Sequence, residues 1–256
     1  MVSFYVDCST DIGNFRKYNE DNYIFKIGSI NGKNIGVFCV ADGMGGLSCG
    51  DVASSIAIET VLLWWDSKIE ILSEYSYKIE DEFWENELRN LFRCINDKII
   101  NMCHEKNVKK SGSTFSLLLI YNKKYFIIHA GDSRIYIKNK RYFEKLTEDQ
   151  TLINMLIKNG EITIEQSKNN NKSHILYNCL GVFENPEEYF KKGMLRNKDT
   201  FLICSDGLYN MISDEDIKSY MGKPENISQT LVNIAKNRGS RDNITSIYIY
   251  VNKTVF

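Results

Sequence analysis

The stretch that decides the fold is FKIGSINGKNIGVFCVADGMGG, residues 25–46. Its apolar segment, residues 35–41, is typical of a buried strand, and it ends abruptly at Asp42. Four of the five residues after Asp42 are Gly or Met, which clears space around the carboxylate. The dipeptide Asn31-Gly32 predicts a hairpin turn just before this strand. With about nine residues in each strand, Asp21 and Asp42 would lie at the same end of the sheet.

The same arrangement recurs further along the chain. The segments YFIIHAGD (125–132) and TFLICSDG (200–207) each carry an apolar run to an aspartate, and SRDNITSIYIYV (240–251) places another just before a run. Hairpin signals at Asn122-Lys123 and at residues 138–140 predict antiparallel strands that alternate in direction. We therefore expect five carboxylates to converge at one edge: Asp21, Asp42, Asp132, Asp206 and Asp242.

Composition narrows the class of protein. The chain has 256 residues, 43% hydrophobic and 25% charged, which is an ordinary globular composition, and it shows no repeat or Pro/Ser-rich linker. A net charge of −1 argues against a nucleic-acid surface or a polybasic membrane face. No apolar run approaches the roughly 20 residues of a membrane span, and no basic region opens a signal peptide. Seven cysteines without a C-x-x-C pair indicate a reducing compartment, so we expect a cytoplasmic protein.

Periodicity predicts an α+β fold with mostly antiparallel sheet. The biased segment SKNNNKS, residues 167–173, is predicted to be a mobile surface loop. Helical spacing of apolar residues predicts helices at 50–65, 83–103, 149–159, 214–221 and 226–238. Strands are predicted at 2–8, 22–27, 35–41, 114–121, 125–130, 134–138, 201–205 and 244–251.

A cluster of carboxylates has a definite chemistry. Like charges a few ångströms apart repel by about 4 kcal/mol per pair near a protein surface, so the cluster needs cations or raised pKa values. Carboxylates without His or Cys companions favour Mg²⁺ or Mn²⁺, which retain several waters. Two such ions would generate a hydroxide nucleophile and neutralise phosphoryl oxygens. Arg16, five residues before Asp21, could bind a phosphate with its planar fork, or it could be a solvated surface arginine.

The order of the motifs resembles that of the protein phosphatase 2C family of metal-dependent Ser/Thr phosphatases, particularly its compact bacterial members. The matching pieces cover essentially the whole chain. They are RKYNED (16–21), VADGMGG (40–46), GDVAS (50–54), GST (112–114), AGDSRIY (130–136), LTEDQT (146–151), SDGL (205–208) and RDNIT (241–245).

The resemblance implies one catalytic domain over residues 1–256, built as a four-layer αββα sandwich of two stacked antiparallel sheets flanked by helices. It implies hydrolysis of phosphoserine and phosphothreonine in proteins by a metal-bridging hydroxide, with two tightly bound Mn²⁺ or Mg²⁺ ions and a weaker third. A cognate Ser/Thr kinase is an implied partner. We expect a monomer that binds neither nucleic acid nor membrane.

The resemblance also implies a role for each site residue. Asp42 would bridge both ions, and the carbonyl of Gly43 would bind the first. The second ion would be held by Asp206 and Asp242. Asp132 would help to hold the third ion, and Arg16 would bind the substrate phosphate. Two further acids would act through metal-bound waters, namely Glu20 and Asp21.

Three positions depart from the family pattern. Met44 stands where many eukaryotic members have His, so a metal-bound water is expected to donate the proton. Gln150 replaces the usual His of LTEDQT, and Asn178 replaces the Arg before the final Leu-Gly of this region. The resemblance implies that this region follows the flap of the family, so we expect these departures to bear on substrate choice and on the third metal.

Other classes were weighed against this interpretation. A phosphoprotein-binding pseudophosphatase would keep the fold without turnover. We would expect such a protein to have lost a metal-binding aspartate, whereas Asp42, Asp206 and Asp242 are all present. The sequence GLSCG (46–50) fits the G-x-S-x-G pattern of serine hydrolases, although Asp42 occupies the strand end. The run GMGGLS (43–48) narrowly misses a dinucleotide-binding fingerprint. His129, in the middle of a predicted strand, is expected to pack or to form hydrogen bonds.

Overall fold

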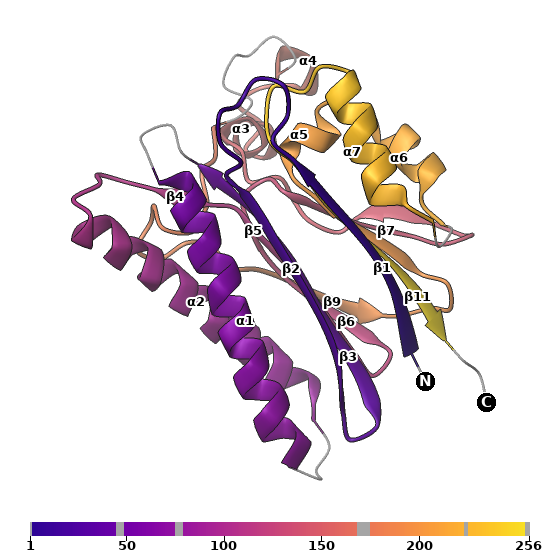
Figure 1. Cartoon of the computed structure of the whole chain (residues 1–256). Coiled ribbons are helices and arrows are strands. Elements are labelled where there is room, and N and C mark those ends of the chain that lie inside the picture. Colours follow the sequence, from indigo (N-terminus) through magenta and orange to yellow (C-terminus); the bar gives the residue numbers. More distant parts are fainter. Residues whose placement is uncertain (1, 45–48, 75–78, 168–174, 223–224, 254–256) are drawn as a thin grey trace.

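The computed structural model describes residues 2–44, 49–74, 79–167, 175–222 and 225–253. Ser48 of the hydrolase-like pattern, Gly45 and Gly46 of VADGMGG, and all of SKNNNKS except Ser167 lie outside these residues. Within them, the chain forms two antiparallel sheets packed face to face, with helices on both outer faces (Figure 1). The predicted α+β sandwich is confirmed.

Every strand pairing within the two sheets is antiparallel. The first sheet has the order β1 (Val2–Asp11), β11 (Ile244–Lys253), β10 (Thr200–Cys204), β7 (Arg134–Lys138) and β8 (Phe143–Lys145). The second has the order β2 (Asp21–Ile30), β3 (Lys33–Met44), β5 (Phe115–Tyr121), β6 (Lys124–Ala130) and β9 (Tyr189–Met194), with the short β4 (Gly112–Ser113) beside β3.

The helices form the two outer layers (Figure 1). The long α1 (Gly50–Glu74) and α2 (Asp81–Glu105) pack on the second sheet. The first sheet is covered by α5 (Asp206–Tyr209), α6 (Asp214–Tyr220) and α7 (Ile227–Asn237). The remaining helices, α3 (Leu152–Lys158) and α4 (Ile164–Ser167), lie near the upper end in Figure 1. None of the described helices is both long and apolar enough to cross a membrane.

The central strand β3 explains why its sequence is an unbroken apolar run. Val37 and Cys39 belong to the core beneath α1 and α2, whereas Phe38 and Val40 belong to the core between the two sheets. Both faces of β3 are therefore buried, so neither set of alternating residues can be polar. A strand buried on both sides holds its end residues rigidly, and one of these is Asp42.

The hairpin between β2 and β3 has the predicted turn and register. Asn31 and Gly32 have φ values of +50° and +72°, which is the left-handed pair of a two-residue hairpin turn. The register then pairs Ile30 with Lys33 at the turn and Asp21 with Asp42 at the far end. The prediction that this hairpin brings the two aspartates together is confirmed.

Several element boundaries differ from the prediction. β3 does not stop before Asp42 but continues to Met44, because Gly43 and Met44 pair with β4. The helix predicted over 149–159 begins only at Leu152, because Thr151 accepts a hydrogen bond from the amide of Asn154 and caps the helix. Other elements were missed because they are short or lie at sheet edges: β4, β8, β9, α4 and α5.

Candidate active site

The five aspartates predicted to converge do so at one end of the sandwich. Asp42 lies in the middle of the group, and its pKa is raised well above the usual range. Burial is the largest cause, and the rest comes from the negative charges of its neighbours Asp21, Asp206, Asp132 and Asp242. Four of these aspartates lie at or next to strand ends, and the fifth lies in the turn before β11. We name the five aspartates together the acidic cluster.

Asp21 lies opposite Asp42 across the hairpin and is 5% exposed. Burial raises the pKa of Asp21 to about 6, although a hydrogen bond from Ser205 opposes the shift. The Ser205 hydroxyl donates to Oδ2 at 2.7 Å, whereas Oδ1 is buried without a hydrogen-bond partner. An unpartnered buried carboxylate oxygen is costly unless a cation or a water satisfies it.

Asp206 repeats this situation from the other sheet. It begins α5 directly after β10, and Asn210 donates to its Oδ2 at 3.1 Å. Its Oδ1 is buried and has no hydrogen-bond partner. Burial first, and then the charges of Asp132 and Asp242, raise the pKa of Asp206. Two carboxylate oxygens from opposite sheets are thus buried in one acidic cluster, and no described residue donates a hydrogen bond to either of them.

The backbone of Asp42 is held by Thr114, which lies between β4 and β5. The Asp42 amide donates to Thr114 Oγ1 at 3.0 Å, and the Thr114 amide donates to the Asp42 carbonyl at 2.9 Å. Thr114 Oγ1 also shares a hydrogen bond of 2.8 Å with the hydroxyl of Ser133. Thr114 belongs to the motif GST, but no role for it was predicted from the sequence.

Gly43 lies where no side chain fits. A Cβ atom at this position would lie 2.1 Å from the carbonyl oxygen of Gly50 and 2.7 Å from that of Glu20. The Gly43 amide donates to the Glu20 carbonyl at 3.1 Å. Glycine thus allows β3, the start of α1 and the segment before β2 to meet beside the acidic cluster.

Asp132 is 7% exposed, and burial raises its pKa to about 6. The neighbouring Arg134 is already engaged, because it binds Asp149 at 2.7 Å and stacks on the ring of Tyr209 at 3.6 Å. Burial is the largest cause of the raised pKa of Asp132, and repulsion from the negative charge of Asp149 raises the pKa further.

Arg16 lies at the acidic cluster and not on a remote surface. Its guanidinium donates to Asp242 at 2.6 Å and lies 3.9 Å from a carboxylate oxygen of Glu20. Burial raises the pKa of Glu20, and the charge of Arg16 opposes this shift. Arg16 also lines an open pocket of about 590 Å³ whose other lining residues are Asp206, Gly207, Asn210, Met211, Ser240, Arg241 and Asp242.

Asn243 fixes the loop that carries Arg16 and Glu20. Its Nδ2 donates to the carbonyls of Ile12 and Tyr18, at 2.9 and 3.0 Å. Its Oδ1 accepts from the Glu20 amide at 2.9 Å. Asn243 follows Asp242 directly in RDNIT, but no role for it was predicted from the sequence.

The donor set of the acidic cluster fits a hard divalent ion, because it offers carboxylate oxygens alone, two of them unpartnered. Among the described residues, no three His, Cys, Asp or Glu side chains are grouped so that they could hold one ion by themselves. Waters would therefore have to complete the coordination sphere of any ion bound here, as they do around Mg²⁺.

His129, one residue before the end of β6, takes no part in the cluster. Its Nδ1 hydrogen-bonds to the Ser116 hydroxyl at 2.8 Å, and its Nε2 to the Glu148 carbonyl at 3.1 Å. Burial lowers the pKa of His129 to about 4, so the ring is neutral at pH 7. The expectation that His129 packs and forms hydrogen bonds is confirmed.

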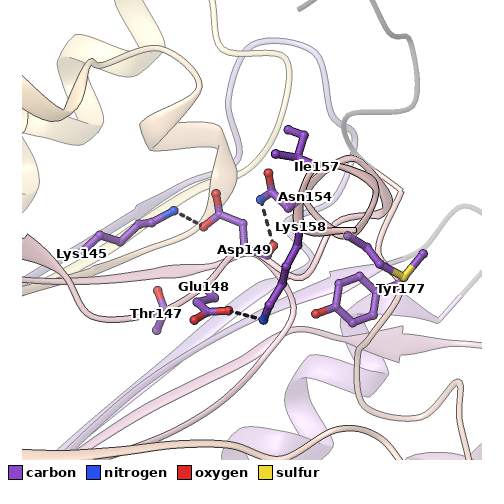
Figure 2. A pocket seen from close by; sticks show the side chains of 9 residues that line it. Lys145, Thr147, Glu148, Asp149, Asn154, Ile157, Lys158 and Tyr177 are labelled. Carbon is purple, nitrogen blue, oxygen red and sulfur yellow. Dashed lines mark hydrogen bonds and ion pairs between the residues drawn. The ribbon is translucent and has the colours of Figure 1, made fainter. Parts of the chain in front are cut away.

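A second pocket, of about 300 Å³, is lined by no member of the acidic cluster (Figure 2). It lies between α3 and residues 145–149, with Tyr177 beside it. Its charged side chains are paired, since Lys145 binds Asp149 at 2.8 Å and Lys158 binds Glu148 at 3.3 Å.

Comparison with known proteins agrees with this geometry. The family model of protein phosphatase 2C matches residues 18–243. The serine/threonine phosphatase stp of Listeria monocytogenes serovar 1/2a is 31% identical over 245 residues, which covers 94% of this chain and 93% of that protein. The chain belongs to the protein phosphatase 2C family.

Solved structures show the same architecture. The serine/threonine phosphatase of S. agalactiae superposes with a TM-score of 0.83 at 28% identity, over 97% of this chain and 99% of that one. The catalytic domain of the serine/threonine phosphatase PstP, solved in complex with two manganese ions, has a TM-score of 0.79 at 25% identity, over 99% of this chain and 100% of that one.

Proposed function

We propose that this serine/threonine phosphatase of the protein phosphatase 2C family uses its acidic cluster to hold divalent metal ions for the hydrolysis of phosphoserine and phosphothreonine in proteins. The observation that carries the proposal is the pair of buried, unpartnered oxygens on Asp21 and Asp206. Such oxygens, in a cluster whose pKa values are raised by burial and mutual repulsion, are satisfied by cations.

When bound, two Mn²⁺ or Mg²⁺ ions supply an activated water and neutralise charge on the phosphoryl oxygens. Asp42, whose neighbours in the cluster come from both sheets, is proposed to bind both ions, with the carbonyl of Gly43 on one. Asp206 and Asp242 are proposed to hold the second ion. Glu20 and Asp21 are proposed to act through metal-bound waters, and Asp132 is proposed to help hold a third ion.

Arg16 is proposed to bind the substrate phosphate. Its half-exposed guanidinium lines the 590 Å³ pocket together with Asp206 and Asp242, so a phosphoryl group entering the pocket meets it beside the acids. The planar fork of arginine matches two phosphate oxygens at once. The ion pair with Asp242 orients the guanidinium before substrate arrives.

We further propose that residues 1–256 act as one catalytic domain, as a monomer, on targets of a cognate Ser/Thr kinase in the cytoplasm. All seven cysteines are free thiols, which supports a reducing compartment. The pseudophosphatase alternative has no observation in its favour, because Asp42, Asp206 and Asp242 are all present in the cluster.

The test is phosphate release from a phosphothreonine peptide by protein stripped with EDTA and then given Mn²⁺ or Mg²⁺. We expect no release without metal and restored release with either ion. Release that persists in EDTA would refute the metal role, and absence of release with both ions would support the silent binding module instead.

A further inference from the structure

The two family departures in the second half of the chain, Gln150 and Asn178, contact each other. Asn178 Nδ2 donates to Gln150 Oε1 at 2.8 Å across 28 residues of sequence. Each side chain is only 2% exposed. Two neutral amides thus form one buried pair where the family pattern has His and Arg.

Backbone donors fix the orientation of both amides. The Gly131 amide donates to Gln150 Oε1 at 2.8 Å, so that atom must be the acceptor oxygen. The Glu187 amide donates to Asn178 Oδ1 at 2.9 Å, which turns the Asn178 amino group towards Gln150. The same amino group donates to the Glu187 carbonyl at 2.9 Å. Each of the two side-chain amides therefore bonds both to the backbone and to the other side chain.

Gln150 and Asn178 belong to two segments, residues 150–152 and 175–178, whose backbones are paired. We name these two segments the stem. The Tyr177 amide donates to the Gln150 carbonyl at 3.0 Å, and the Leu152 amide donates to the Ile175 carbonyl at 2.7 Å. Tyr177 lines the pocket of Figure 2 opposite α3, so that pocket lies against the stem.

The pair is also joined to the acidic cluster. The backbone amide of Gln150 donates to the Gly131 carbonyl at 2.8 Å. Gln150 therefore binds both the N–H and the carbonyl of Gly131, one with its side chain and one with its backbone. Gly131 has a φ of +104°, and a Cβ there would lie 2.7 Å from the Thr114 Cβ. Gly131 precedes Asp132, and Thr114 holds the backbone of Asp42.

We propose that Gln150 and Asn178 are positioning residues for the phosphatase reaction. Gln150 binds Gly131 directly, and Asn178 holds the side chain of Gln150 in place. Through Gly131, the pair sets the position of the Asp132 carboxylate relative to Asp42, and it connects these acids to the stem. The inference rests on the proposed role of Asp132. Neither side chain touches substrate, so their loss changes the placement of an acid without removing it.

The test uses Gln150→Met, Asn178→Ala and the double variant. We expect kcat for a phosphothreonine peptide to fall about tenfold in each single variant, with KM within about twofold, because a small misplacement at a reacting centre has a large effect on rate. If the two amides act as one unit, the double variant loses about tenfold as well and not about a hundredfold.

Asn96→Ala is the matched control. Asn96 is 1% exposed, and its side-chain amide bonds to backbone groups: it donates to the carbonyls of Phe183 and Glu184 and accepts from the Gly181 amide at 2.8 Å. We expect this variant to melt at a lower temperature while kcat stays within about twofold. An equal loss of kcat in Asn96→Ala would mean that any buried amide matters, and would overturn the proposal.

Hydrogen exchange supplies a measurement that does not depend on turnover. In Gln150→Met and in Asn178→Ala, the Gly131 amide should exchange at least about tenfold faster, and in Asn96→Ala it should not change. Full kcat in Gln150→Met, multiplicative losses in the double variant, or unchanged Gly131 exchange would overturn the inference. Absence of metal-dependent turnover in the parent protein would instead count against the proposed function, and Gly131 exchange would still test the link.

Discussion

At the scale of single residues, the site depends on acids that the fold buries wholly, as at Asp21 and Asp132, or in part. At Asp42 and at Asp206, burial and the charges of neighbouring acids both raise the pKa and so oppose ionisation. In the proposed function, bound cations stabilise the ionised carboxylates, so the repulsion within the metal-free cluster favours metal binding. Changes to these residues should therefore affect metal binding before they affect folding.

Asp206→Asn and Asp242→Asn are each expected to weaken Mn²⁺ binding and to remove most turnover, because an amide replaces an anionic ligand. Melting of the metal-free variants should not fall, since repulsion in the cluster decreases. Calorimetric titration with Mn²⁺ and peptide kinetics measure both effects. Glu215→Gln, at a carboxylate 81% exposed, is the control. Parental rates at saturating Mn²⁺ would refute the ligand assignment.

Arg16→Ala is expected to raise KM for a phosphopeptide more than it lowers kcat, because the guanidinium binds the phosphate before and during reaction. Arg16→Lys should recover only part of the affinity, since a point charge cannot replace a fork. Mn²⁺ affinity should hardly move. An unchanged KM in Arg16→Ala would return this residue to the role of a structural partner of Asp242.

Asp132→Ala separates a third-metal role from a structural one. We expect two tightly bound Mn²⁺ ions and near-parental melting, with turnover at least about tenfold slower, a barrier increase of about 1.4 kcal/mol. A purely structural aspartate would cost about 1 kcal/mol of stability and little rate. Metal counting beside kinetics distinguishes them, and loss of the two tightly bound ions would show that Asp132 has been misassigned.

At the scale of elements, the strands that could be predicted are those with a local pattern. Asn31-Gly32 specifies the β2–β3 turn, and the apolar run of β3 reveals its burial on both faces. The strand β9 was missed because it is a sheet edge that carries Lys191 and Lys192, as protected edges do. The helix α5 has only four residues, too few to show a period.

The parts of the site that could not be predicted are contacts between distant segments. Thr114 meets Asp42 across 72 residues, and Asn243 meets Ile12 across 231. A side chain that bonds to remote backbone leaves no periodic trace in its own segment. The motifs GST and RDNIT marked both residues, but only the packing of the two sheets gives them a role.

The strand β6 carries a testable pH dependence through His129. Its pKa is lowered from 6.5 to about 4 by burial, so the folded state keeps the ring neutral. Stability from this residue is therefore present above pH 6.5 and lost as the pH falls through 6.5 towards 4. Between pH 7 and pH 5 the loss is about 2 kcal/mol.

His129→Gln should remove this part of the pH dependence while keeping a donor and an acceptor for Ser116 and Glu148. Urea unfolding of both proteins at pH 7 and pH 5, with EDTA present, measures the difference. The parent should lose about 2 kcal/mol more than the variant. Equal losses would mean that His129 is not held neutral by the fold.

At the scale of the whole molecule, the site exists because two sheets meet at one end. Asp21, Asp42 and Asp132 come from the second sheet or its strand ends, whereas Asp206 and Asp242 flank strands of the first. The core between the sheets, which includes Phe38 and Phe201, sets their separation. Metal ions held between acids from both sheets should therefore stabilise the entire sandwich, because they bind only the folded protein.

The most direct test is Mn²⁺ titration of EDTA-stripped protein, followed at once by bound ions per chain, melting temperature and phosphopeptide hydrolysis. We predict two tightly bound ions, and hydrolysis that appears as they bind. The melting temperature should rise by about 10–20 °C, because each of the two ions adds about 2.7 kcal/mol at a hundredfold excess over its Kd. Hydrolysis before any ion binds, or tight binding of Mn²⁺ without hydrolysis or stabilisation, would contradict the account.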